Sequence, residues 1–129
     1  MNRAIVGVGS NIEPERYILQ ARELIDGIGT VSAESTFVET PAINRPELPD
    51  FVNGAWLIET KLDQDAFNQE LKKIEHACDR VRCEDRFASR TMDLDLILWN
   101  NTIVDADYYT RDFLQDAVRE LLPDFHPGS

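Results

Sequence analysis

Residues 80–99 read RVRCEDRFASRTMDLDLILW, an arginine-rich segment that runs directly into an apolar β-strand. Four arginines fall within eleven residues, and Asp93 and Asp95 follow them one residue apart. Guanidinium groups are planar, permanently charged forks that match phosphate oxygens. Side chains at i and i+2 of a strand share a face, so the two carboxylates can hold hard divalent ions such as Mg2+ together. The stretch therefore indicates chemistry on a polyphosphate.

The acidity of the whole chain makes this basic cluster informative. The protein has 129 residues, a formal net charge of −11 and 43% hydrophobic residues, which predict one globular domain over residues 1–129. Such an acidic balance argues against general binding of nucleic acid or of anionic membranes. For the arginines taken alone, a solvated charged face stays open as the alternative.

Two cysteines, Cys78 and Cys83, flank the start of the arginine segment, and His76 is the only imidazole nearby. A zinc site needs about four such ligands, so we expect two free thiols in a reducing compartment. The N-terminus runs into a short strand without a long apolar segment. The expected location is the cytoplasm.

The hydrophobic pattern alternates between the periods of strands and helices. The expected elements are a strand from residue 4, a helix to about 26–27, strands at 30–40 and 51–60, a helix from about 63, strands at 92–99 and 102–104 joined by a turn at 100–101, and a helix at 113–122. This order predicts an α+β fold: a ferredoxin-like βαββαβ antiparallel sheet with helices packed on one face, plus a C-terminal hairpin strand and helix.

The end of the first predicted strand and the proline-containing segment 41–50 carry further expectations. Gly7 and Gly9 leave room for another backbone to approach the first strand closely. Ser10 or Asn11 is expected to cap the first helix. The segment 41–50 contains three prolines and is too long for a simple hairpin, and loops of that length in small domains tend to be functional.

The Asp-Leu-Asp pattern also has a plain structural explanation, because polar and apolar residues alternate on any exposed strand. Its neighbours favour a functional reading. Arg90 lies three residues before Asp93, and Arg82 and Arg86 belong to the same loop. Cations beside paired carboxylates are what binding of a metal-polyphosphate complex requires.

Residues 90–95, Arg-Thr-Met-Asp-Leu-Asp, resemble the signature of 6-hydroxymethyl-7,8-dihydropterin pyrophosphokinase, an enzyme family of the folate pathway. Further segments match this family in the same order: 9–11, 40–41, 49–55, 74–75, 80–82, 111–113 and 120–123. The resemblance covers residues 4 to about 127. It implies transfer of pyrophosphate from ATP to the pterin hydroxymethyl group, with release of AMP.

The resemblance also implies roles for individual residues. Two Mg2+ ions would be held by Asp93 and Asp95, which together with Arg82 and Arg90 form the expected catalytic set. The expected ATP contacts are Lys72, Glu75, Arg82, Arg86, Arg90, Leu96 and Arg111. The expected pterin contacts are Thr40, Pro41, Ala42, Ile43, Phe51, Asn53, Phe87, Asp93 and Phe113. In this family the two phenylalanines Phe51 and Phe113 would sandwich the ring, although core packing is the alternative for both.

The chain departs from the family pattern after its metal aspartates. The segment between Asp95 and Arg111 is shorter than in typical relatives, and the family's histidine has no counterpart among residues 108–110. This loss falls on nucleotide contacts more than on the carboxylate pair.

Three functions therefore stay open. The favoured one is an active pyrophosphokinase that takes a pterin and ATP, binds neither nucleic acid nor membrane, and is a monomer. The second is a catalytically weak or inactive family-derived protein that binds a pterin or nucleotide. The third is another metal-dependent nucleotidyl enzyme. The retained charges of Arg82, Arg90, Asp93 and Asp95 favour the enzyme, and the pterin-side match at 51–53 speaks against the third option.

Overall fold

The structure of the chain is a computed structural model that describes residues 1–41, 50–78 and 92–125. These residues form a six-stranded sheet in which every pairing is antiparallel. The strands are β1 (Asn2–Ser10), β2 (Thr30–Glu34), β3 (Val38–Thr40), β4 (Phe51–Thr60), β5 (Asp93–Trp99) and β6 (Thr102–Ile103). Their spatial order is β2-β4-β1-β5-β6, and β3 pairs with β4 beside β2.

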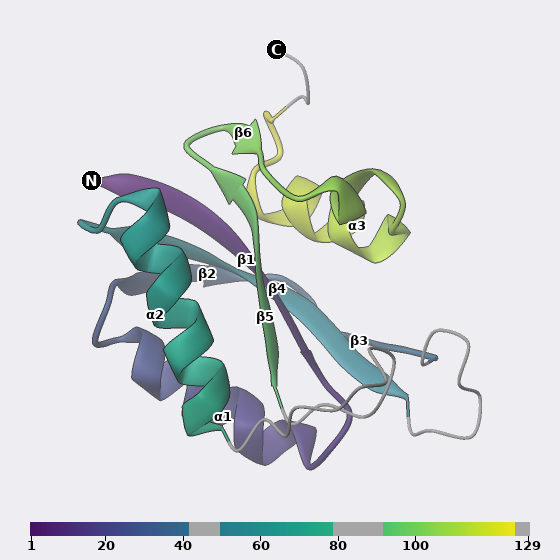
Figure 1. Cartoon of the computed structure of the whole chain (residues 1–129). Helices are drawn as coiled ribbons and strands as arrows, with labels where there is room; N and C mark the ends of the chain where they lie inside the picture. Colours follow the sequence, from purple (N-terminus) through teal and green to yellow (C-terminus); the bar gives the residue numbers. More distant parts are fainter. Residues whose placement is uncertain (42–49, 79–91, 126–129) are drawn as a thin grey trace.

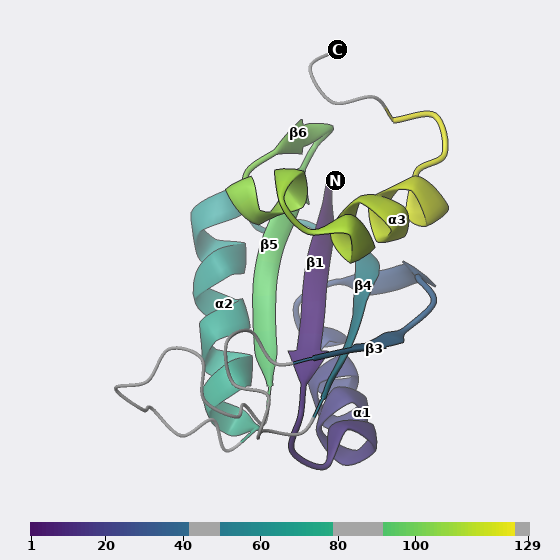
Figure 2. The same cartoon turned by 90° about the vertical axis from the view of Figure 1, so that its right-hand side faces the viewer.

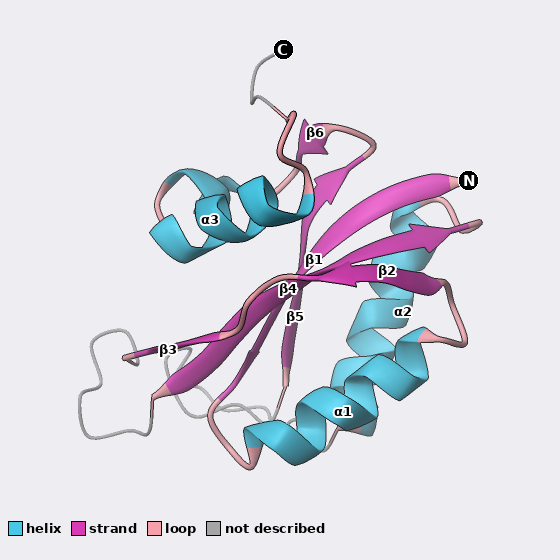
Figure 3. Ribbon diagram, turned by 180° about the vertical axis from the view of Figure 1, so that it is seen from behind, coloured by secondary structure: helices cyan, strands magenta, loops and turns pink. Residues whose placement is uncertain are grey.

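The helices form layers on both faces of this sheet (Figures 1 and 2). They are α1 (Pro14–Ile25), α2 (Gln64–Ala77) and α3 (Asp112–Leu121), with a short 3-10 helix, η1 (Ala106–Tyr109), before the last. Seen from behind, α1 and α2 lie on one side of the strands and α3 lies on the other (Figure 3). The predicted ferredoxin-like sheet with its two βαβ helices on one face is confirmed, and the C-terminal helix covers the opposite face.

Each layer has its own apolar core. Beneath α1 and α2, Trp56 of β4 and Leu94 of β5 pack with Phe67 and Leu71 of α2. The apolar positions of α2 recur at three- and four-residue steps, and the carboxylate of Asp63 caps this helix by accepting a hydrogen bond from the Ala66 amide at 2.8 Å. The second cluster joins α3 to the other face of β1, β4 and β5.

Two local predictions are wrong. The strand expected at 30–40 is divided into β2 and β3, because residues 35–37 leave the ladder with β4. Neither Ser10 nor Asn11 caps α1: the N-cap residue is Glu13, which takes a left-handed conformation (φ 41°) before Pro14 begins the helix. The fixed φ of proline suits the first helical turn, and this start has no side-chain cap.

The β5–β6 hairpin follows its prediction. Asn100 and Asn101 both have positive φ, 48° and 72°, as a two-residue turn between antiparallel strands requires. Within β5, Ile97 is an extra residue relative to β1, where Ile5 pairs with Leu98 and Val6 with Leu96. This bulge places both Ile97 and Leu98 in the core beneath α3.

Among the described residues, none of the helices has the length and apolar content needed to cross a membrane.

Candidate functional site

Asp93 and Asp95 lie at the start of β5, on the sheet face that α3 covers further along the strand. Their Cα partners on the central strand β1 are Gly9 and Gly7. Gly9 in turn pairs with Asn53 of β4. Because directly paired residues of antiparallel strands point to the same face, Asp93, Gly9 and Asn53 form one row across three strands. A glycine in the middle of this row leaves the space between the carboxylate and the amide without a side chain of β1.

The two glycines admit side chains rather than another backbone, which corrects the sequence prediction. A Cβ added to Gly9 would lie 2.8 Å from Oδ1 of Asn53, so the amide of Asn53 reaches over the glycine. At Gly7 the corresponding contacts are side-chain carbons of Ile97 and Leu114 at 3.4–3.5 Å. Gly9 therefore makes room for a site residue, and Gly7 makes room for the core.

The described residues predicted to contact the pterin gather on this face. Phe51 and Asn53 have the same strand parity on β4, and Thr40 of β3 pairs with Phe51. The Asn53 amide nitrogen donates a hydrogen bond to the Thr40 hydroxyl oxygen. Phe113, at the beginning of α3, packs half-buried against the core of the same face. Sequence positions 40, 51, 53, 93 and 113 are thus brought to one side of the sheet.

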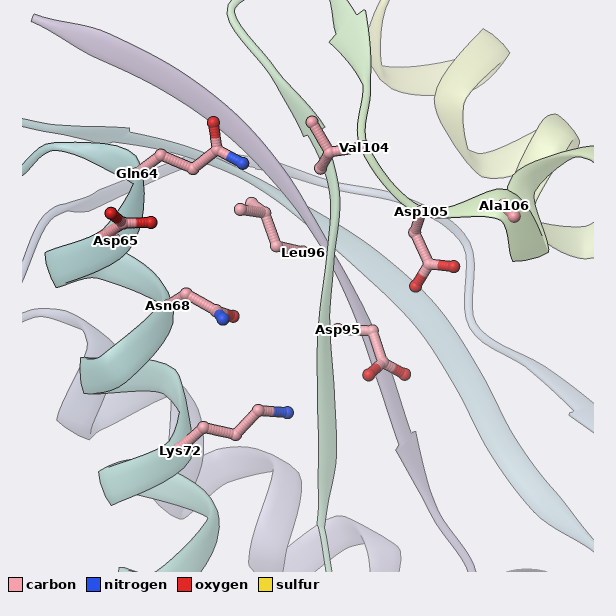
Figure 4. Close-up of a pocket in the computed structure, with 9 residues that line it drawn as sticks. All are labelled: Gln64, Asp65, Asn68, Lys72, Asp95, Leu96, Val104, Asp105 and Ala106. Atoms are coloured by element: carbon pink, nitrogen blue, oxygen red, sulfur yellow. The ribbon is translucent and has the colours of Figure 1, made fainter.

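A pocket of about 320 Å³ lies at the free edge of β5, between α2 and the segment that leads into η1 (Figure 4). It is lined by Gln64, Asp65, Asn68, Lys72, Asp95, Leu96, Val104, Asp105 and Ala106. Lys72 and Asn68 extend from α2 toward β5, and Asp95 and Asp105 lie beyond the strand in the same view (Figure 4). Lys72 is the only cationic side chain among these lining residues. Three predicted residues, Lys72, Asp95 and Leu96, therefore meet at one pocket.

Glu75 lies one helical turn after Lys72 and is almost fully buried, at 1% exposure. One of its carboxylate oxygens accepts a hydrogen bond from the Leu94 amide at 2.8 Å, and the other lies 3.3 Å from Nζ of Lys72. Leu94 stands between the two aspartates on β5. Glu75 therefore connects the strand segment of the carboxylate pair to the cation of the pocket, and its predicted contact with ATP stays a prediction.

Asp95 has an unusual electrostatic environment. Burial raises the pKa of its carboxyl group first, and the negative charges of Asp93, Glu75 and Asp105 raise it further. The positive charge of Lys72 acts in the opposite direction, and the resulting pKa is about 7. A carboxylate that is costly to ionise in the apo protein is well suited to a divalent cation, which would supply the missing positive charge. Within the described ranges, no group of three or more His, Cys, Asp or Glu side chains is arranged to hold a metal ion.

The remaining predicted residues fall into two groups. Pro41 is exposed after β3, and Arg111 precedes α3 with Nε 3.7 Å from an oxygen of Asp107. The predictions for Ala42, Ile43, Arg82, Arg86, Phe87 and Arg90 lie outside the described residues.

Four polar residues of the pocket were not identified from the sequence: Gln64, Asp65, Asn68 and Asp105. A signal was present in α2, because Gln64, Asn68 and Lys72 recur every four residues and so share one helix face. Asp105 gave no comparable signal, since only the β5–β6 hairpin returns it to the edge of β5 beside Asp95.

Comparison with known proteins supports one family. The family model of 7,8-dihydro-6-hydroxymethylpterin-pyrophosphokinase matches residues 5–123. A 2-amino-4-hydroxy-6-hydroxymethyldihydropteridine pyrophosphokinase of Haemophilus influenzae is 31% identical, over 96% of this chain and 84% of its own. Proteins of the same name from Pseudomonas putida and Pseudomonas aeruginosa are also 31% identical, covering 80% and 96% of this chain and 87% and 83% of their own lengths.

Proposed function

Because the chain belongs to the 7,8-dihydro-6-hydroxymethylpterin-pyrophosphokinase family, we propose that it transfers pyrophosphate from ATP to the hydroxymethyl group of 6-hydroxymethyl-7,8-dihydropterin and releases AMP. Family membership makes the protein a pyrophosphokinase, a transferase of folate biosynthesis. The geometry of the site supports one surface for the phosphate donor, ATP, and another for the acceptor, the pterin.

One observation carries this assignment: the carboxylate pair stands between two different surfaces. On the α3 face, Asp93 shares a row with Gly9 and Asn53, where the flat acceptor would lie. At the edge of β5, Asp95 lines the pocket that contains Lys72, where the donor would lie. A transfer reaction needs its two substrates to meet at the reacting phosphorus, and this arrangement brings both surfaces to one pair of residues.

The acceptor side has the parts that a pterin needs. A flat heterocycle gains apolar contact from aromatic side chains, here Phe51 and Phe113. Its polar edge needs hydrogen-bonding groups, and the amide of Asn53 offers both a donor and an acceptor. Because Asn53 is already bonded to the Thr40 hydroxyl, its amide is held in one orientation before a ligand arrives.

The carboxylate pair fits Mg2+, and we propose two ions at Asp93 and Asp95. Carboxylate oxygens are the ligands that this hard cation prefers, and a bound cation would offset the burial and the neighbouring negative charges that raise the pKa of Asp95. Mg2+ held by these carboxylates would neutralise charge on the phosphates of the donor. Lys72 would add a further positive charge on the pocket side, with Glu75 holding its ammonium group.

The chain's own contribution to the reaction is positioning. The pterin hydroxyl oxygen attacks the β-phosphorus, and a new phosphorus–oxygen bond forms as the bond from that phosphorus to the α-phosphate oxygen breaks. AMP leaves with the bonding electron pair, and the hydroxyl proton is released. Holding the attacking oxygen in line with the leaving oxygen is the main requirement of such a transfer. Arg82 and Arg90 are proposed to bind the phosphates, and Arg86 and Phe87 to belong to a segment that closes over them.

We further propose that the protein works as a monomeric single domain in the cytoplasm. One sheet contains every described strand, which supports a single domain. The chain contains only two cysteines, Cys78 and Cys83, and such a low content is typical of proteins from a reducing compartment.

Release of AMP tests the function directly. The wild-type protein is incubated with Mg2+, ATP and 6-hydroxymethyl-7,8-dihydropterin, and AMP and the pterin diphosphate are quantified by chromatography. Both products should appear in equal amounts, and neither should appear without the pterin or in the presence of EDTA. Pterin binding without any AMP would instead favour the catalytically weak or inactive binding protein.

A further inference from the structure

The break between β2 and β3 is held to β4 by specific contacts. Ser35 donates its backbone N–H to the carbonyl of Ala55 at 2.9 Å, and its hydroxyl oxygen accepts a hydrogen bond from the Ala55 amide at 2.8 Å. The ring of Phe37 lies against Gly54, where a Cβ would come within 2.4 Å of the ring. Residues 35–37 therefore occupy a defined position, although they interrupt the edge strand.

A third contact ties the same break to α3. Thr36 donates its backbone N–H to both carboxylate oxygens of Glu120, each at 2.8 Å, and its hydroxyl donates to one of them at 3.1 Å. Hydrogen bonds to an ionised acceptor are stronger than those between neutral groups. Glu120 stands in the last turn of α3, 84 residues further along the chain than Thr36. We call this set of three bonds the Thr36–Glu120 clamp.

The clamp joins β3 and α3, the two elements that contribute Thr40 and Phe113 to the proposed pterin site. β3 begins two residues after Thr36 and ends at Thr40, which holds the amide of Asn53. Phe113, the second residue of α3, lies on the same face of the sheet. A shift of β3 relative to α3 would therefore move Thr40 and Phe113 relative to each other.

We propose that Glu120 is a positioning residue for the acceptor substrate, an inference that rests on the proposed function. Through Thr36 it fixes the start of β3, and through β3 it fixes the hydrogen bond between Thr40 and Asn53. Glu120 does not itself touch the pterin in this proposal.

β3 makes few contacts of its own, so the clamp adds to the contacts of Ser35 and Phe37 that precede the strand. The strand has three residues, and within the described part of the chain it pairs with β4 alone. Short edge strands open locally at low free-energy cost. Each opening would release Thr40 from Asn53, and a ligand would then have to order the strand at the expense of its own affinity. A set of bonds at Thr36, two residues before the strand, suppresses this opening.

Binding measurements on Glu120→Ala separate positioning from mere stability. Pterin affinity is measured by calorimetry with Mg2+ and saturating α,β-methylene ATP, which cannot be cleaved at the reacting bond. We expect the pterin Kd to rise about five- to tenfold, as the loss of a charge-assisted bond predicts. The Kd of the ATP analogue, measured alone, should stay within about twofold, because the clamp lies on the acceptor side. Steady-state kinetics should likewise show a higher pterin KM with a smaller change in kcat.

One variant serves as the matched control, and two others should give intermediate losses. Asp116→Asn removes a carboxylate from the same helix that pairs only with Arg119 among its described contacts, at 3.4 Å, and should bind pterin as the wild type does. Glu120→Gln keeps one acceptor oxygen for the Thr36 amide and should restore part of the affinity. Thr36→Val keeps the amide donor, loses only the hydroxyl bond, and should show the smallest loss.

Amide hydrogen exchange gives a ligand-free readout. Thr40 should exchange faster in Glu120→Ala than in wild type or in Asp116→Asn. A lower melting temperature with unchanged pterin Kd would overturn the proposal and leave the clamp a purely structural contact. If Glu120→Ala does not fold, Glu120→Gln and Thr36→Val decide by the same criteria. Absence of pterin binding by the wild-type protein would instead overturn the proposed function.

Discussion

The Glu75 carboxylate accepts a hydrogen bond from the Leu94 amide at 2.8 Å, in the interval between Asp93 and Asp95. This amide points away from β1 at the free edge of β5, so no strand of the described sheet pairs with it there. A buried amide without an acceptor costs about 1–3 kcal/mol. The bond therefore satisfies the backbone of the strand segment that carries the carboxylate pair, and it does so with a charge that also holds Lys72.

Glu75→Ala should destabilise the fold by about 2 kcal/mol, because the Leu94 amide loses its acceptor and a cavity is left. Urea unfolding measures this change, and Leu94 should exchange its amide hydrogen faster. Glu75→Gln retains an acceptor oxygen and should lose about half as much. Glu70→Ala, in the same helix, removes a more exposed partner of Lys73 at 3.0 Å and should change stability by at most about 0.5 kcal/mol. Equal losses at Glu75 and Glu70 would refute this account of the bond.

Asp95→Asn should abolish AMP release and make the apo protein more stable at pH 8. The substitution removes a metal ligand, and it also removes a charge that burial and Asp93 make costly. Thermal unfolding without metal should give a higher melting temperature than for wild type. Mg2+ should raise the melting temperature of wild type but have little effect on the variant. A variant that melts far below wild type would contradict the assignment of Asp95 to a metal site in which its negative charge destabilises the apo protein.

The stability of the apo protein should depend on pH through Asp95. Its pKa is about 7 in the folded protein against 3.8 for the ordinary value. Between these values the folded state binds a proton that the unfolded chain has lost, so the free energy of unfolding falls as the pH rises, by at most about 1.4 kcal/mol per pH unit. Urea unfolding between pH 5 and pH 8 measures the slope. In Asp95→Asn the part of the slope due to this group should disappear, and an unchanged slope would show that other groups cause it.

Much of the fold could be predicted from local patterns. The apolar spacing of α2 and the turn at Asn100-Asn101 depend on residues close in sequence, and both are found as expected. The break at residues 35–37 could not be predicted, because its causes are remote. Gly54 makes room for the Phe37 ring, and Glu120 binds Thr36 across 84 residues. A β-branched, alternating stretch carries no trace of either contact.

The site shows the same division. The spacing of Asp93 and Asp95 was enough to place both on one strand face. The approach of Lys72 to Asp95 depends on α2 packing along the free edge of β5, which only the sheet order determines. Likewise, the row from Asp93 through Gly9 to Asn53 exists only because β1 lies between β5 and β4 in one register. The sequence pattern indicates these groups, and the topology decides which of them meet.

Gly9→Ala should weaken pterin binding about tenfold while leaving the fold intact. The new methyl group would lie 2.8 Å from Oδ1 of Asn53, so the amide must turn away and lose its bond to Thr40. The obstructing atom is the end of a side chain, so the cost to folding should stay within about 1 kcal/mol. Calorimetry with Mg2+ and α,β-methylene ATP measures the pterin Kd.

Gly7→Ala is the matched control for this prediction, since it adds the same methyl group to the same strand face two residues away. There the methyl would meet Ile97 and Leu114 at 3.4–3.5 Å, which is close to ordinary packing distance. Pterin affinity should change less than about twofold, because no hydrogen-bonding group of the acceptor surface has to move. If Gly7→Ala weakens pterin binding more than Gly9→Ala does, the row from Asp93 to Asn53 is not the surface on which the acceptor lies.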